Sequence, residues 1–133
     1  MLVIEGVELL ANVAHEDSRG SLVALEEHSG IPFEPRRIFY ITVTDSSSIR
    51  AGHAGTSEQL MIALTGGVSV ELDNGAEQSC IRLADKLESL WVRPGIWLRL
   101  KDFSSGTVLL VISSLTYAET KHFMKPQPLF QAE

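Results

Sequence analysis

Apolar and polar residues alternate along most of this 133-residue chain, and no other feature restricts its fold as much. A period of two predicts β-strands, because successive side chains of a strand point to opposite faces of the sheet. Short alternating segments cover residues 21–27, 36–44, 59–66, 67–75, 78–85, 89–95, 97–103 and 107–115. Turn residues separate them, and Asn74-Gly75 is typical of a type I′ hairpin turn, which needs positive φ at both central positions. The pattern therefore indicates an all-β protein.

The number of strands favours a closed or two-layered antiparallel architecture, since they are too many for one open sheet. We predict a jelly-roll β-barrel, and an immunoglobulin-type sandwich is less favoured because its cysteine pair is absent. No helical stripe of useful length occurs before residue 115. The tail, residues 116–130, has room for one helical turn before Pro126 and Pro128. The length predicts a single domain over residues 1–133.

Charge and composition exclude several classes of function. The net charge of -6 argues against a nucleic-acid surface, because phosphate-backbone binding needs clustered Lys and Arg. It leaves open an anionic small molecule, for which two or three local arginines suffice. Cys80 is the single cysteine, so we predict no intrachain disulfide and a reducing, cytoplasmic location. No apolar run reaches about 18 residues and the N-terminus lacks a basic region, so we predict neither a membrane span nor a signal peptide.

His53 is the first candidate for chemistry, within the stretch RAGHAGTSEQ of residues 50–59. Gly52 and Gly55 leave space beside the ring, as a ligand pocket requires, although a histidine bonded to a backbone carbonyl would fit the same pattern. His53 and Glu58 match two of the four ligand positions of the cupin metal motif. A stable metal site generally has three or more protein ligands, so we predict no metal and no cofactor.

Arginine and tyrosine supply the other candidates. Arg19, Arg37 and Arg50 are candidates for substrate binding, because the guanidinium fork suits phosphate and carboxylate. Alternation puts Arg36 and Arg37 on opposite faces, so at most one of them points into a barrel. Tyr40 is a candidate catalytic residue, since a phenol can donate a proton or a hydrogen bond. Most other aromatic residues are predicted to pack in the core. Neither a nucleophile elbow nor a phosphate-binding P-loop is present.

Five stretches, taken in order, resemble the sugar-nucleotide 3,4-ketoisomerases of the WxcM-like family, which act on TDP-4-keto-6-deoxyglucose. They are DSRGSLVALEE (17–27), IPFEPRRIFYI (31–41), RAGHAG (50–55), LWVRPGIW (90–97) and DFSSGTVLLVISSLTYAET (102–120), and the resemblance covers roughly residues 8–130. It implies a cupin-type jelly roll, a homodimer that exchanges N-terminal strands, and a metal-free site inside the barrel. It also implies a TDP-linked keto-deoxysugar as substrate, whose ketone moves from C-4 to C-3 through an enediol.

The chain departs from the family pattern at two places in the implied site. Family members read Arg-Gly-x-His-Ala-His-Lys, which Arg50 and His53 match. The second histidine of that motif, the base that removes the C-3 proton, falls on Gly55, and the lysine falls on Thr56. Family members also tend to read Trp-His-Glu at residues 97–99, where this chain has Trp-Leu-Arg. Loss of a general base commonly costs about 10²–10⁴-fold in rate.

Three functions remain open from the sequence. The first is an isomerase with a replacement base, for which Tyr40 and an ordered water held by His53 are candidates and Glu58 is a poorer one. His53 corresponds to the residue that shuttles a proton between the two substrate oxygens. The second is a catalytically silent cupin that binds a nucleotide sugar or regulates a partner, suggested by the losses at Gly55 and Leu98. The third is a cupin for an unrelated small ligand in the vacated space.

Overall fold

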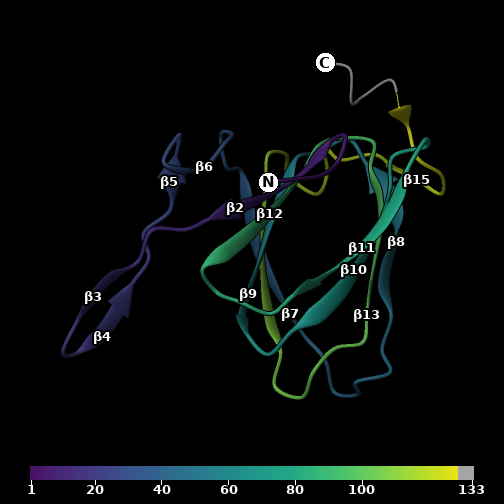
Figure 1. Ribbon diagram of the computed structural model, residues 1–133. Helices are drawn as coiled ribbons and strands as arrows, with labels where there is room; N and C mark the ends of the chain where they lie inside the picture. The colour runs from purple at the N-terminus through teal and green to yellow at the C-terminus, as the bar shows by residue number, and fades with distance from the viewer. Residues whose placement is uncertain (129–133) are drawn as a thin grey trace.

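Two antiparallel β-sheets face each other in the computed structural model of the chain, which describes residues 1–128 (Figure 1). In order across the first sheet, the strands are β1 (Leu2–Ile4), β2 (Val7–Ala11), β12 (Glu88–Val92), β9 (Gln59–Thr65), β14 (Val108–Ser113) and β7 (Arg37–Thr42). The second contains β11 (Gln78–Leu83), β10 (Val68–Asp73), β13 (Trp97–Lys101), β8 (Arg50–Gly55) and β15 (His122–Phe123). The predicted all-β jelly-roll class is confirmed. Residues 129–133 of the predicted domain lie outside the described residues.

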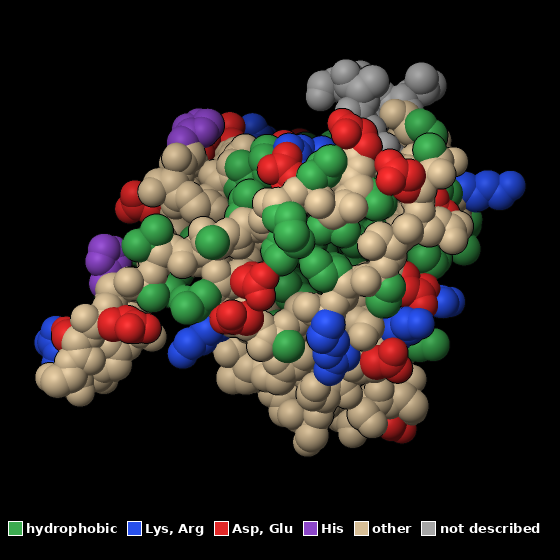
Figure 2. Space-filling view, viewed as in Figure 1, with side chains coloured by type: hydrophobic (Ala, Val, Ile, Leu, Met, Phe, Trp, Pro, Cys, Tyr) green, Lys and Arg blue, Asp and Glu red, His purple; other side chains and the backbone are tan. Residues whose placement is uncertain are grey.

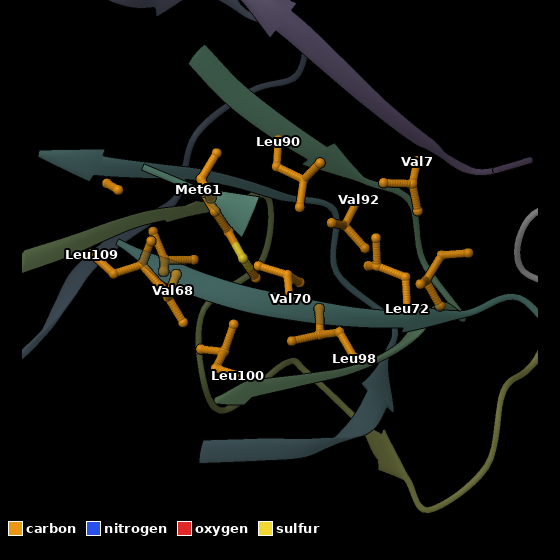
Figure 3. Close-up of a cluster of buried hydrophobic side chains, with 14 of the residues drawn as sticks. Val7, Met61, Val68, Val70, Leu72, Leu90, Val92, Leu98, Leu100 and Leu109 are labelled. Carbon is orange, nitrogen blue, oxygen red and sulfur yellow. The ribbon is translucent and has the colours of Figure 1, made fainter. Parts of the chain in front are cut away.

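Alternate residues of both sheets build the shared core. Along β10, Val68, Val70 and Leu72 are buried, whereas the intervening residues are partly exposed. Figure 3 shows these side chains, with Met61 from β9 and Leu98 from β13, pointing into the space between the sheets. Burial of a side chain of this size stabilises the fold by about 1.5–3 kcal/mol. The core therefore fixes which face of each strand points inward.

The hairpin at Asn74-Gly75 forms as predicted, but its turn is of another type. Asp73 pairs with Gln78, which leaves a four-residue loop, and only Gly75 of the pair has positive φ (94°). Asn74 Oδ1 accepts hydrogen bonds from the backbone N–H groups of Ala76 and Glu77, at 2.8 and 2.7 Å. These side-chain bonds hold a longer loop, so the predicted type I′ turn is wrong.

A short arm extends from the barrel near the N-terminus (Figure 1). It contains the hairpin of β3 (His15–Asp17) and β4 (Gly20–Leu22), every residue of which is exposed. The predicted strand over residues 21–27 is split between β4 and β5 (Glu26–Glu27), the latter pairing with β6 (Gly30–Ile31). Figure 2 shows the arm standing apart from the barrel, with charged side chains at its tip. The arm has no sheet to pack on, and this explains why the alternating segment 21–27 does not form one strand.

The tail makes a single turn and then joins the second sheet. Glu119 accepts hydrogen bonds from the backbone and hydroxyl of Thr116, whose hydroxyl accepts one from Glu119 N–H, a reciprocal arrangement typical of a helix start. Thr120 N–H donates to the Thr116 carbonyl at 3.2 Å, which closes the predicted helical turn. β15 follows and pairs with β8. Within residues 1–128, no helix has the length and apolar character needed to cross a membrane.

Candidate active site

A β-bulge in β8 brings Arg50 and His53 to the same face of the strand. His53 pairs with Leu98 and Ala51 pairs with Arg99, so Gly52 is left without a partner across the ladder. Residues three apart on a regular strand point to opposite faces, and one extra residue reverses this relation. Ala51 and Gly52 have φ of 64° and 95°, a conformation in which Ala51 is strained. The bulge thus gives both functional candidates access to one cavity.

That cavity is a hollow of about 140 Å³ between the two sheets. Phe39 and Ile41 from β7 line one side, and Arg50, His53 and Leu98 line the other. The remaining wall is mostly apolar core. His53 therefore faces the barrel interior, and the hollow is smaller than the roughly 300–1,000 Å³ of a typical ligand pocket.

A second hollow, of about 20 Å³, lies beside Gly55. Polar groups around it come from His53, Gln59, Arg93 and His122. Arg93 stacks on the Trp91 ring and pairs with Glu8 through Nη2, yet its buried Nη1 has no hydrogen-bond partner among residues 1–128. A volume of this size holds about one water.

His122 is the site residue that the sequence did not identify. It pairs directly with Gly55 across β8 and β15 and lines the small hollow. Its ring centroid lies 4.5 Å from that of His53, with an interplanar angle of 64°. The tail carries only two residues of strand, and so short a segment gives no alternation that could predict its pairing. Two imidazoles therefore meet where the sequence suggested one.

Burial sets the charge of His53. Desolvation lowers the pKa of this imidazole, and the nearby His122 lowers it further, while a backbone hydrogen bond opposes both with a smaller effect. His53 is therefore neutral at neutral pH. A neutral imidazole has one nitrogen that donates and one that accepts, so it can pass a proton from one oxygen to another.

Two arginines near these histidines are free to bind an anion. The Arg37 guanidinium lies 4.3 Å from the Phe39 ring centroid and 5.1 Å from that of Tyr117, whose ring is in turn 6.0 Å from His122. Arg50 lines the larger hollow at the other end of β8. Within the described part of the chain, neither guanidinium forms an ion pair or a hydrogen bond, whereas Arg19, Arg36, Arg82, Arg93 and Arg99 all do. Arg37 shares the partly buried face of β7 with Phe39 and Ile41, which agrees with the prediction that at most one of Arg36 and Arg37 points inward.

Three sequence candidates are not brought to this site. Tyr40 is 71% exposed on the outer face of β7, because Phe39 and Ile41 take the inward positions, so the expectation that it lines the site is wrong for a single chain. Arg19 lies on the arm, with its side chain 88% exposed and paired with Asp17. Glu58 accepts a hydrogen bond from Trp91 Nε1 at 3.1 Å and lines neither hollow.

Leu98 occupies the second place where the chain departs from the family pattern. It is only 5% exposed, lies opposite His53 and lines both hollows. The wall at this position is therefore apolar. Within residues 1–128, no three His, Cys, Asp or Glu side chains lie close enough to hold a metal ion.

An antiparallel jelly roll with a histidine-lined hollow between its sheets defines the class, that of the cupin-type barrels. The particular family follows from comparison: the chain belongs to the WxcM-like family, because the FdtA model described as "WxcM-like, C-terminal" matches residues 5–131. The resemblance drawn from the sequence is thereby confirmed.

Known relatives in this family are sugar-nucleotide isomerases. The chain is 41% identical over 107 residues to TDP-4-oxo-6-deoxy-α-D-glucose-3,4-oxoisomerase of Aneurinibacillus thermoaerophilus, covering 80% of this chain and 77% of that one. It is 33% identical to the WlaRB TDP-quinovose 3,4-ketoisomerase of Campylobacter jejuni, with a TM-score of 0.87 and coverage of 92% and 95%. A mutant of the 3,4-ketoisomerase QdtA of Thermoanaerobacterium thermosaccharolyticum, solved with TDP-4-keto-6-deoxyglucose, is 32% identical, with a TM-score of 0.85 and coverage of 94% and 90%.

Proposed function

We propose that this protein is a 3,4-ketoisomerase acting on a TDP-linked 4-keto-6-deoxysugar. The observation that carries the proposal is the neutral imidazole of His53, which faces a hollow between the sheets in a chain 41% identical to a 3,4-oxoisomerase. The reaction needs a proton removed from C-3, a proton moved between two oxygens and a proton returned at C-4. No oxidant or reductant is consumed, so acid–base groups alone suffice.

His53 is proposed to transfer a proton between the two substrate oxygens. As C-3 loses its proton, the C-4 carbonyl becomes an enediolate oxygen that must be protonated while the C-3 hydroxyl loses its proton. A neutral imidazole can donate to one oxygen and accept from the other. Because burial lowers its pKa, His53 keeps this neutral form at neutral pH.

Arg37 and Arg50 are proposed to bind the diphosphate. Both lack a carboxylate partner within residues 1–128, so an incoming phosphate need not displace one. The larger hollow, at about 140 Å³, is too small for a whole nucleotide sugar. We therefore place the hexose in the hollow, with the diphosphate and the base at its rim.

We also propose a homodimer that exchanges N-terminal segments. An isolated two-stranded hairpin is marginally stable in water, and the β3–β4 hairpin is fully exposed. Its Leu22 is exposed, as are Ile38 and Tyr40 on the outer face of β7. Packing of the arm on a second copy would cover such groups and would carry Arg19 toward the partner's site, which is how Arg19 could still bind substrate.

Three further assignments remain proposals. Residues 1–133 form one cupin-type domain. The protein works in the cytoplasm, a location that suits its free, exposed Cys80. Its net charge of -6 supports the absence of nucleic-acid binding, and we expect no membrane partner.

A catalytically silent nucleotide-sugar-binding or regulatory protein is the alternative. Gly55 and Leu98 favour it, since each replaces a histidine of the family pattern. Such a protein would bind TDP but leave the sugar unchanged. A protein that binds an unrelated small ligand would neither bind TDP nor convert the sugar.

Incubation with TDP-4-keto-6-deoxyglucose in deuterated water, followed by NMR of the sugar, tests the proposal. A ketoisomerase should produce the 3-keto sugar with solvent deuterium on the ring. Calorimetric titration with TDP separates the remaining cases. Saturable TDP binding without conversion or exchange would favour the silent protein, and absence of both would exclude both readings.

A further inference from the structure

We propose that the imidazole of His122 performs the carbon proton transfer for which residue 55 has no side chain. The proposal rests on the ketoisomerase activity proposed above and names a residue outside the family motif. It assigns a catalytic role to β15, a two-residue strand in the tail.

Strand pairing places His122 where the missing side chain would act. His53 and Gly55 are two residues apart on β8, so their side-chain directions share the inward face. Directly opposed residues of antiparallel strands have Cβ atoms about 4.5–5.5 Å apart on one face. His122 is the residue opposed to Gly55, and both line the small hollow with His53.

The orientation of the ring agrees with this placement. A Cβ atom at position 55 would lie 3.9 Å from His122 Cδ2, the carbon bonded to Nε2. Cδ2 is thus the atom of the His122 ring that lies nearest to the space left by Gly55. His122 and Gly55 both line the hollow of about 20 Å³, which has room for one water, so the proton can pass directly or through that water.

Two hydrogen bonds to Lys121, the residue just before β15, hold His122 in place. Thr56 N–H donates to the Lys121 carbonyl at 3.1 Å, and Lys121 N–H donates to Thr56 Oγ1 at 3.0 Å. The rings of His53 and Tyr117 lie beside the His122 ring, with centroids 4.5 and 6.0 Å away. A base held in this way loses little of its rate advantage to misorientation.

Thr56 also links this arrangement to the sequence. It stands where the family motif has lysine, next to the Gly55 that replaces histidine. A lysine has no hydroxyl to accept the Lys121 N–H bond. The changes at residues 55 and 56 thus open a space beside β8 and supply an anchor for the strand that carries a new imidazole.

The proposed step balances without a cofactor. A His122 nitrogen forms a bond to the C-3 proton as the C–H bond breaks, and the released electron pair forms the C-3–C-4 double bond. The C-4 carbonyl electrons move to O-4, and His53 transfers a proton from O-3 to O-4. The O-3 electrons then form the C-3 carbonyl, and the double-bond pair takes a proton from the His122 imidazolium at C-4. His122 is exposed to solvent on its free side, so its proton can exchange with water.

The test is a comparison of His122→Gln with the unchanged protein and with His28→Gln. His28 is a matched control because it is an exposed histidine beside β5, outside both hollows. His122→Gln should lower kcat by about 10²–10⁴-fold and abolish deuterium incorporation at the sugar carbons, while TDP affinity stays within about threefold. His28→Gln should retain full activity.

A second variant separates a catalytic role from a structural one. Gly55→His in the His122→Gln background offers an imidazole from β8 instead of β15. Gly55 has ordinary φ, and a Cβ there would make contacts of 3.7–3.9 Å, so the backbone accepts the change. The double variant should regain at least tenfold in kcat over His122→Gln. Loss of activity through misfolding would not be rescued in this way.

The outcomes distinguish this inference from the proposed function. An active unchanged protein with a His122→Gln variant that keeps more than half its kcat would overturn the role of His122 and leave the ketoisomerase activity intact. A His122→Gln variant that loses only TDP affinity would also overturn it. An unchanged protein without turnover or exchange would refute the activity itself.

Discussion

His53 is the residue whose protonation ties this site to pH. Its lowered pKa means that the folded chain releases this proton at a pH where the unfolded chain still holds it. Above about 6.5, the usual pKa of histidine, the imidazole is neutral in both states. Stability associated with His53 is therefore complete above that pH and is lost as the pH falls through the lowered pKa.

We predict that kcat is independent of His53 protonation above pH of about 6.5 and falls only on further acidification. Proton NMR of the imidazole, assigned by loss of the signal in His53→Asn, should give a pKa below that value. His122→Gln should raise the His53 pKa, because the neighbouring charge that lowers it is removed. A His53 signal that titrates above 6.5 would contradict the description of this residue.

Arg50 is the residue on which anion binding can be tested most directly. We predict that Arg50→Gln weakens TDP binding about 10- to 100-fold, the usual loss for a hydrogen bond to a charged group. Arg36→Gln is the matched control, since Arg36 lies 3.8 Å from Glu34 and 3.9 Å from Glu119. Calorimetry should show a Kd for the control within about twofold of the unchanged protein. Equal TDP affinities for all three proteins would show that Arg50 does not bind TDP.

At the scale of elements, the bulge in β8 decides whether the two motif residues act together. Gly52 has φ of 95° and no atom within 4 Å of the place where a Cβ would be, so an alanine there is strained by backbone conformation alone. We predict that Gly52→Ala lowers stability by about 1–3 kcal/mol and lowers kcat and TDP affinity as the bulge shifts. Denaturation and turnover assays measure these effects.

Gly106→Ala provides the comparison for that experiment. Gly106 also has positive φ (75°) and open space, but it lies in the loop before β14, outside both hollows. The Gly106→Ala variant should lose about as much stability as Gly52→Ala, while its kcat stays that of the unchanged protein. If Gly52→Ala also kept full turnover, the bulge would have no role in aligning Arg50 with His53.

The elements also show how far the sequence could lead. Strands of strict alternation, such as β10 and β13, were predictable because their buried residues repeat every second position. The strand β8 was not predictable, because RAGHAG has few apolar side chains and a bulge breaks its period of two. β15 was too short to give a pattern, so His122 could not be associated with Gly55. The placement of Tyr40 failed because sequence alone did not say which face of β7 is covered.

At the scale of the whole molecule, the arm is the part that a single chain does not explain. We predict a dimer in solution, with twice the mass of one chain by light scattering at micromolar concentration. Leu22→Asp should weaken the dimer, because it puts a charge on a surface that the partner would cover. Met124→Asp is a control at another exposed apolar residue, which lies in the tail. A monomeric unchanged protein would contradict the exchange of N-terminal segments.

The central claim is that C-3 and C-4 of the bound sugar lie beside two adjoining imidazoles, His53 from β8 and His122 from β15. A crystal structure of the His53→Asn variant with TDP-4-keto-6-deoxyglucose tests it most directly, because loss of His53 should slow turnover. The account predicts C-3 of the sugar within about 3.5 Å of a His122 nitrogen, or one water away from it, and the two reacting oxygens beside residue 53. A sugar bound with its C-3 and C-4 turned away from His122, or bound outside the barrel, would contradict it.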